Sequence, residues 1–293
     1  MPQYIHIFQM AKVASRSWLK LLQAARSEDT ISNFHVTSGH RVEIDDALFQ
    51  KPASELSIKY NALPGPAAPD MSIRVQLDGQ SWKGPRSKII TGVRDPLARA
   101  LSVAGYFTNY LGYKNYPVTI RDRGTPENLA RLFKTALSLA RMHKPPPPDD
   151  ILLAVLSEMI LLSKVWFEEE LKPTFGLDIA DHRLNFDRAS LVITGEHDLF
   201  AYRFEDAVDP SRVPLMFAAA SDFFETELTC FPTDTSVENR YRKFFDMFKT
   251  ALVLTEEELE WFYEGAAMSV FYSAEEISAM KSKWHAQLVE PQP

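Results

Sequence analysis

Two segments of this chain each combine a strand with a helix that follows it directly, and this repeated unit limits the fold more than any other feature. Residues 4–8 are rich in β-branched and aromatic side chains, and residues 15–26 carry apolar side chains at helical spacing. Residues 88–93 are apolar enough for a strand buried on both faces, and Pro96 fits the first turn of a helix over 97–110. This alternation predicts a parallel sheet with helices on both faces and a ligand beyond the carboxyl ends of the strands.

Two more strands are expected, at 33–37 and 199–204. Residues 41–87 contain five prolines and no long period, which predicts an irregular excursion before the central strand. Further helices are expected over 126–143, 149–171, 211–226, 237–249, 255–264 and 273–286. The sequence therefore predicts one α/β domain over 1–293, with a helical insertion at about 120–175 and a mostly helical C-terminal part over 207–293.

The overall charge restricts the kind of partner. The 293 residues carry a net charge of −7, which argues against binding to nucleic acid or to an anionic membrane surface, because both need clustered positive charge. Any anionic ligand must then be held by local groups. The single cysteine, Cys230, excludes an intramolecular disulfide and fits a reducing compartment. The N-terminus has no signal-peptide pattern and no transmembrane segment is expected, so a cytoplasmic location is predicted.

The turn after the first strand is the first candidate site. It reads Lys-Val-Ala-Ser-Arg-Ser-Trp over residues 12–18, where a helix N-terminus favours an anion. A nucleoside triphosphate loop would end in Gly-Lys-Ser/Thr, and no glycine precedes Gly39. Lys12, followed by small and hydroxyl residues, would instead surround an oxyanion with one cation and two hydroxyls. The same residues also fit an ordinary capped helix start beside a solvated lysine.

The turn after the central strand is the second candidate site. Arg94 leaves the strand, Asp95 is placed to cap the next helix, and Ser102 stands eight residues after Arg94. Arg94 and Ser102 are predicted to meet across a bound phosphate, with Arg99 beside Ser102 on the helix surface. The alternative is a surface salt bridge for Arg94 and a small-residue packing role for Ser102.

In this order the two segments resemble the nucleotide-dependent sulfotransferases, especially a bacterial capsular polysaccharide synthesis group. The stretch Phe-Gln-Met-Ala-Lys-Val-Ala-Ser at 8–15 is similar to that group's Q-M-G-K-V-G-S loop, and residues 93–102 are similar to V-R-D-P-x-x-R-x-x-S. A third likeness joins residues 165–179 to W-F-x-x-E-L-K-P-x-F-G-I-D, and residues 203–206 to the start of R-x-E-D-L. This third part suggests no chemistry of its own.

The resemblance implies a three-layer sheet like that of the P-loop NTPases and a 3′-phosphoadenosine 5′-phosphosulfate (PAPS) cosubstrate, with a carbohydrate hydroxyl as the expected acceptor. The residues that it assigns to PAPS are Lys12, Ala14, Ser15, Arg16, Ser17 and Trp18 around the 5′-phosphosulfate, with Arg94 and Ser102 at the 3′-phosphate. The chain departs from the family pattern at Ala11 and Ala14, which replace glycines, and at Arg16, which replaces a hydroxyl residue.

Sulfuryl transfer needs a base for the acceptor proton and a cation at the leaving oxygen. Lys12 suits the second task. Related glycan sulfotransferases carry the base near the end of the second strand, where this chain has His35 and His40, and the loop position favours His40. Either histidine also fits an ordinary hydrogen-bonded role. No metal is expected, because His, Asp and Glu do not cluster at ligand spacing and one cysteine cannot begin a zinc pair.

Two other functions fit parts of the pattern. One is a kinase of the same P-loop-like architecture, which would need a Gly-Lys phosphate loop. The other is a non-catalytic protein that kept the fold while Ala11, Ala14 and Arg16 degraded the site. Binding of ATP or of adenosine 3′,5′-bisphosphate separates these alternatives.

Overall fold

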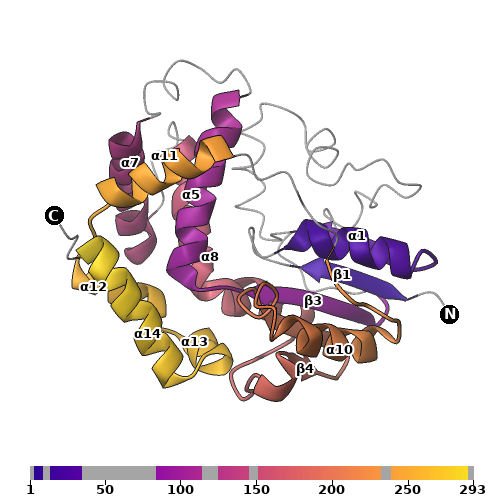
Figure 1. Ribbon diagram of the computed structural model, residues 1–293. Helices are drawn as coiled ribbons and strands as arrows, with labels where there is room; N and C mark the ends of the chain where they lie inside the picture. Colours follow the sequence, from indigo (N-terminus) through magenta and orange to yellow (C-terminus); the bar gives the residue numbers. More distant parts are fainter. Residues whose placement is uncertain are drawn as a thin grey trace. The chain divides into compact units, whose positions relative to one another are not determined.

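A computed structural model describes residues 3–8, 14–34, 84–113, 125–144, 151–231 and 239–289 (Figure 1). The chain divides into two compact units, which are described separately. The sheet unit contains Met1–Arg94 and Val165–Thr233, and the helical unit contains Asp95–Lys164 and Asp234–Pro293. The expectation of one domain over 1–293 stays a prediction.

The described part of the sheet unit contains a five-stranded, mostly parallel sheet. Its strands are β1 (Tyr4–Phe8), β2 (Thr30–Phe34), β3 (Ser87–Val93), β4 (Leu191–Ile193) and β5 (Asp198–Arg203). They lie in the order β2-β1-β3-β5-β4, and β4 is an antiparallel edge strand while the other four are parallel. The mixed α/β class is confirmed. The second strand begins at Thr30, three residues before the predicted start, and β4 was not predicted.

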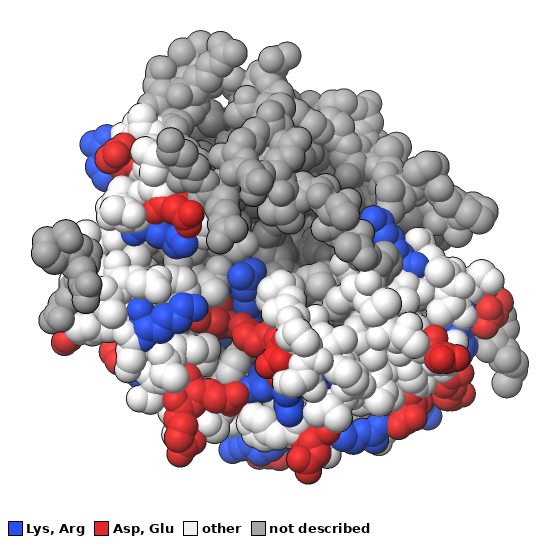
Figure 2. All heavy atoms as spheres, viewed as in Figure 1, with Lys and Arg blue, Asp and Glu red and all other residues white. Residues whose placement is uncertain are grey.

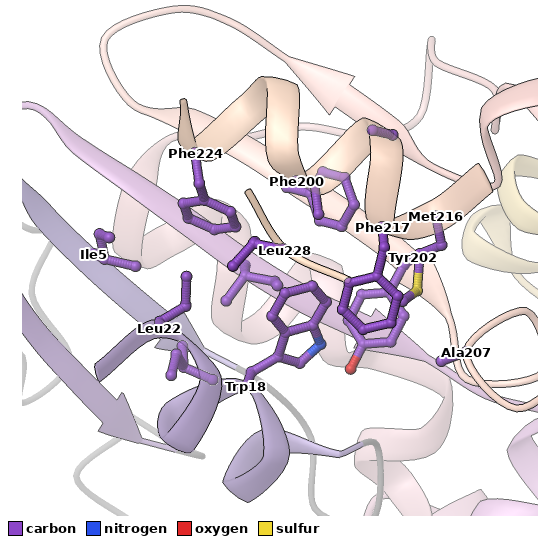
Figure 3. Packing of buried hydrophobic residues seen from close by; sticks show 14 of the residues in the cluster. Ile5, Trp18, Leu22, Phe200, Tyr202, Ala207, Met216, Phe217, Phe224 and Leu228 are labelled. Atoms are coloured by element: carbon purple, nitrogen blue, oxygen red, sulfur yellow. The ribbon is translucent and has the colours of Figure 1, made fainter. Parts of the chain in front are cut away.

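One face of the sheet is covered by α1 (Ser15–Ala25) and α10 (Val213–Phe224). Trp18 of α1 is fully buried on this face, with its ring centroid 5.6 Å from that of Tyr202 and 5.7 Å from that of Phe217 (Figure 3). Aromatic contacts of this kind add to the stabilisation that comes from burial alone. Trp18 therefore attaches the first helix to the sheet.

Tyr202 explains one glycine of the central strand. A Cβ at Gly92 would lie 2.8 Å from Cζ of the Tyr202 ring, so a larger residue would displace a fully buried side chain. The end of β3 is therefore closely packed before the chain reaches Arg94.

The other face of the sheet is covered by a segment that had no assigned role in the sequence. Trp166 ends α8 (Ile151–Trp166), and the chain continues as a π-helical turn, η1 (Phe167–Leu171), and a short helix, α9 (Lys172–Phe175). The Trp166 indole donates a hydrogen bond to Thr91 Oγ1 at 3.3 Å, and its ring centroid lies 4.7 Å from that of Phe8. The family-like segment 165–179 thus begins by packing on the sheet.

The helical unit joins the predicted insertion to the C-terminal helices. Its ring pair Phe133 and Phe248 has centroids 6.0 Å apart, and Lys134 forms an ion pair with Glu258. Apart from α8, most of which belongs to this unit, its helices are α5 (Pro96–Tyr113), α7 (Pro126–Arg141), α11 (Asn239–Ala251), α12 (Glu256–Tyr263), α13 (Ala266–Phe271), α14 (Ala274–Trp284) and η3 (His285–Val289). The helical character predicted for these regions is confirmed, and α13 is an addition.

Asp95 holds the start of α5, as predicted, and does more than cap it. Its Oδ1 accepts hydrogen bonds from the Leu97 and Ala98 amides at 3.0 and 3.1 Å. The Tyr263 hydroxyl donates to the same oxygen at 3.0 Å, and the Trp284 indole donates to Oδ2 at 2.7 Å. Because this carboxylate is buried, its four donors replace the water that it loses. The C-terminal helices therefore fix the first turn of α5.

The surface of the described residues carries mixed charge. Basic and acidic side chains are interspersed over the described part of the face in Figure 2. Among the described helices, none is long and apolar enough to cross a membrane.

The buried His6 side chain should make the stability of the fold depend on pH. It is buried on β1, with Nε2 3.1 Å from Ser87 Oγ, and the Ser87 amide donates to His197 Nδ1 at 3.2 Å. Burial, and to a lesser degree the neighbouring His197, lowers the pKa of His6 to about 3 from 6.5. As the pH falls, His6 therefore takes up a proton in the unfolded chain before it does so in the folded one. The free energy of unfolding decreases between pH 6.5 and about 3, by about 1.4 kcal/mol per pH unit.

The His6→Gln variant lacks the imidazole that takes up this proton. We expect its free energy of unfolding, measured with denaturant at several pH values below 6.5, to fall less steeply than that of the unmodified chain. Parallel curves for the two proteins would contradict the assignment.

Candidate functional site

The strand order gives a candidate position for a ligand beside β1. β1 pairs in parallel with β2 on one side and with β3 on the other. The chain therefore crosses from one side of β1 to the other between β2 and β3, which makes the β1–β3 boundary a topological switch point. Ligands of open parallel sheets bind at such points, outside the carboxyl ends of the strands. The turn into α1 and residue Arg94 both follow strands that end at this edge.

Ala14 has an unusual backbone conformation in the first of these turns. It precedes α1 with φ 68° and ψ 23°, in the left-handed region. Its carbonyl oxygen accepts hydrogen bonds from the amides of Ser17 and Trp18 at 3.0 and 3.1 Å. A residue with a Cβ pays about 1–2 kcal/mol for this conformation, which glycine adopts freely. The turn thus keeps the backbone of a glycine although it carries an alanine.

Several predicted residues lie outside the described part of the chain. These are Lys12, Ala11, His35 and His40. Their predicted roles as cation, loop residue and base stay predictions. Ser15 and Arg16 are described as the first turn of α1 through their backbone only, and Ser17 in the same turn is half-buried.

Trp18 was predicted as part of the binding loop, and its side chain lies in the core between the sheet and α10. The indole is an anchor for α1, so only the Trp18 backbone remains near the start of the helix. The Trp18 side chain therefore fixes the position of α1 on the sheet.

Arg94 lies directly after β3, as predicted. Its guanidinium carbon is 4.7 Å from the centroid of the Phe204 ring. The Phe204 amide donates to the Val93 carbonyl at 2.7 Å, which extends the pairing of β3 and β5 beyond Arg203. Phe204 was not predicted as a site residue, although it lies inside the family-like segment 203–206.

The other predicted residues of the second turn belong to the helical unit. Ser102 lies on α5 and is half-buried. Arg99 was predicted on the helix surface and is instead fully buried, where it donates to the Met159 carbonyl at 2.7 Å and to Ser163 Oγ. These α8 partners could not be predicted from helical spacing within α5. Arg99 therefore joins α5 to α8, and the pairing of Arg94 with Ser102 stays a prediction.

The family-like segment 203–206 forms a buried ion pair. Arg203 donates from Nε and Nη2 to the two carboxylate oxygens of Asp206, at 2.7 Å each. Arg212 Nε donates to the same carboxylate at 3.1 Å. Both Arg203 and Asp206 are almost completely buried, and a bidentate pair of this kind fixes geometry closely. The segment thus sets the path of the chain after β5.

The described residues of this edge bear on two kinds of ligand, metal ions and oxyanions. Within the described ranges, no group of three or more His, Cys, Asp or Glu residues could hold a metal ion. A helix N-terminus after β1 and an arginine after β3 are both groups that bind phosphate and sulfate. Comparison of the chain with protein-family models, with curated proteins and with solved structures gives no match.

The Ala14 turn gives a direct test. We expect Ala14→Gly to raise the free energy of unfolding by about 1 kcal/mol, because glycine removes the cost of the left-handed conformation. Ala24→Gly, at an exposed position of the same helix, is the control and should lower it by roughly 0.5–1 kcal/mol. Denaturant unfolding of both variants measures the difference, and a loss of stability in both would contradict the assigned conformation.

Proposed function

We propose that this chain is a sulfotransferase that transfers a sulfuryl group from PAPS to an acceptor hydroxyl, with a carbohydrate as the expected acceptor. The observation that carries the proposal is the left-handed turn at Ala14, which joins β1 to α1 at the switch point of the sheet. A non-glycine residue held in this conformation is typical of functional turns. A parallel sheet packed on both faces fits the proposed three-layer, P-loop-like fold.

The two turns suit a nucleotide with phosphates at both ends of its ribose. In the proposal the first turn of α1 receives the 5′-phosphosulfate, since helix N-termini favour anions. Arg94, which leaves the neighbouring strand, contacts the 3′-phosphate. The resemblance adds Ser102 of the helical unit to this second role as a sequence prediction. ATP carries all its phosphates on the 5′ side and would leave Arg94 unused.

The proposed reaction is a single in-line displacement. The acceptor oxygen attacks the sulfur, an S–O bond forms, and the S–O bond to the 5′-phosphate breaks. The acceptor proton passes to His40 or His35, and Lys12 neutralises the charge that develops on the leaving phosphate oxygen. The products are a sulfate ester and adenosine 3′,5′-bisphosphate. We propose a cytoplasmic location, because the single cysteine fits a reducing compartment.

Nucleotide binding and transfer test this function. Adenosine 3′,5′-bisphosphate at a hundred times its Kd should stabilise the folded chain by about 2.7 kcal/mol in thermal unfolding, with ATP much less effective. Lys12→Ala should abolish sulfuryl transfer with a modest loss of nucleotide affinity. Arg94→Ala should weaken nucleotide binding by about 1.5–3 kcal/mol, the usual loss for a charged hydrogen bond, and Ser102→Ala should also weaken it. Arg183→Ala, at an exposed arginine of the sheet unit, is the control and should change neither property.

Three outcomes would contradict the proposal. Stabilisation by ATP alone would favour the kinase, and binding of neither nucleotide would favour a non-catalytic protein. Equal and mild effects of the Lys12, Arg94 and Ser102 variants would remove the roles given to these residues.

A further inference from the structure

We infer that Phe204 is a positioning residue for anion binding, which holds the Arg94 guanidinium at the carboxyl edge of the sheet. The inference deepens the proposed function and rests on it, since it takes Arg94 as the ligand of the nucleotide's 3′-phosphate. It also gives a role to the family-like segment 203–206, to which the sequence assigned no chemistry.

The backbone sets Phe204 and Arg94 opposite each other. Val93 pairs with Arg203 in the parallel ladder, and Arg94 and Phe204 are the next residues on the two strands. The hydrogen bond from the Phe204 amide to the Val93 carbonyl, at 2.7 Å, keeps the ends of β3 and β5 together at this point. The Phe204 ring and the Arg94 guanidinium, 4.7 Å apart, are therefore direct neighbours across the strand ends.

Phe204 is itself held by the turn that follows it. Its carbonyl accepts a hydrogen bond from the Ala207 amide at 3.1 Å, and the Arg203 carbonyl accepts from the same amide at 3.2 Å. The buried bidentate pair of Arg203 and Asp206 spans the turn, and Arg212 adds a third contact. The backbone that carries the Phe204 ring is therefore held in place by the turn.

A stacked arginine is well prepared to bind phosphate. The Arg94 guanidinium carbon lies over the Phe204 ring, and a guanidinium carries five N–H donors at the edge of its plane. A phosphate can then accept two parallel hydrogen bonds from this edge. Because the ring already limits the rotamers of the long side chain, less freedom is lost when the anion binds. Phe204 thus acts through Arg94 and does not touch the ligand.

Calorimetric titration of the full chain tests the inference with two probes, adenosine 3′,5′-bisphosphate and inorganic pyrophosphate. Phe204→Leu should weaken binding of the nucleotide about three- to thirtyfold, the range expected for loss of a cation–π contact. Phe204→Tyr keeps an aromatic face and should restore most of the affinity. In an Arg94→Ala background, Phe204→Leu should cause no further loss, because the two residues act as one unit.

Phe186→Leu is the matched control. Phe186 lies 5.2 Å from the Arg203 guanidinium carbon, so this change also removes an arginine–phenylalanine contact of the sheet unit, but not the one with Arg94. It should weaken nucleotide binding much less than Phe204→Leu does, because Arg203 keeps its bidentate pair with Asp206. Thermal unfolding of each variant checks folding, and Phe204→Met replaces Phe204→Leu if the leucine variant does not fold.

The outcomes separate the inference from the proposed function. Wild-type affinity in Phe204→Leu, or an additive loss in the Arg94→Ala background, would overturn the role of Phe204 while the sulfotransferase proposal stands. Pyrophosphate binding that needs Phe204 and Arg94, with no gain from the nucleoside, would support the role and overturn the proposed function. If neither probe binds the unmodified chain, both are overturned.

Discussion

The parallel pairing of β1, β3 and β5 decides which residues of the sheet unit meet at one edge. Because the register aligns Ile7 with Ile90 and Ile90 with Phe200, the three strands end close together. The turn into α1, residue Arg94 and the turn after β5 all begin where these strands end. Among the described residues, a helix N-terminus, a guanidinium and an aromatic ring thus follow these strand ends.

Packing on the two faces keeps this edge in place. Trp18 fixes α1 on one face, and Trp166 covers the other through its contact with Phe8 and its hydrogen bond to Thr91. The buried pair of Arg203 and Asp206 fixes the turn after β5. Replacing only one of Arg203 and Asp206 by a neutral residue would leave the other as an uncompensated buried charge. Such a change should lower the free energy of unfolding strongly. Buried residues of the sheet unit therefore hold the carboxyl edge of the sheet in place.

Local patterns predicted what depends on local interactions. Strands β1 and β3, the helices after them and the cap by Asp95 follow from apolar runs, helical spacing and the Asp-Pro signal. Two other features were not predicted. The indole that donates to Asp95 belongs to Trp284, far along the chain. Strand β4 has only three residues and pairs as an antiparallel edge strand. Such features depend on long-range packing, which no window of sequence contains.

Individual side chains were harder to place than elements. Trp18 has the sequence position of a binding-loop residue and the burial of a core residue, because the first inward position of α1 falls directly after the turn. Arg99 matches the motif and is fully buried on the Met159 carbonyl and Ser163. Phe204 was not predicted as a site residue, because its place opposite Arg94 depends on the pairing of β3 with β5. Spacing predicted the site's elements, and tertiary contacts decided which side chains face it.

A crystal structure of the full chain with adenosine 3′,5′-bisphosphate tests most directly whether the nucleotide binds at the carboxyl ends of β1 and β3. We expect one phosphate within about 3 Å of the first-turn amides of α1 and the other within the same distance of the Arg94 guanidinium. A nucleotide bound away from the carboxyl ends of β1 and β3, with neither contact, would contradict it.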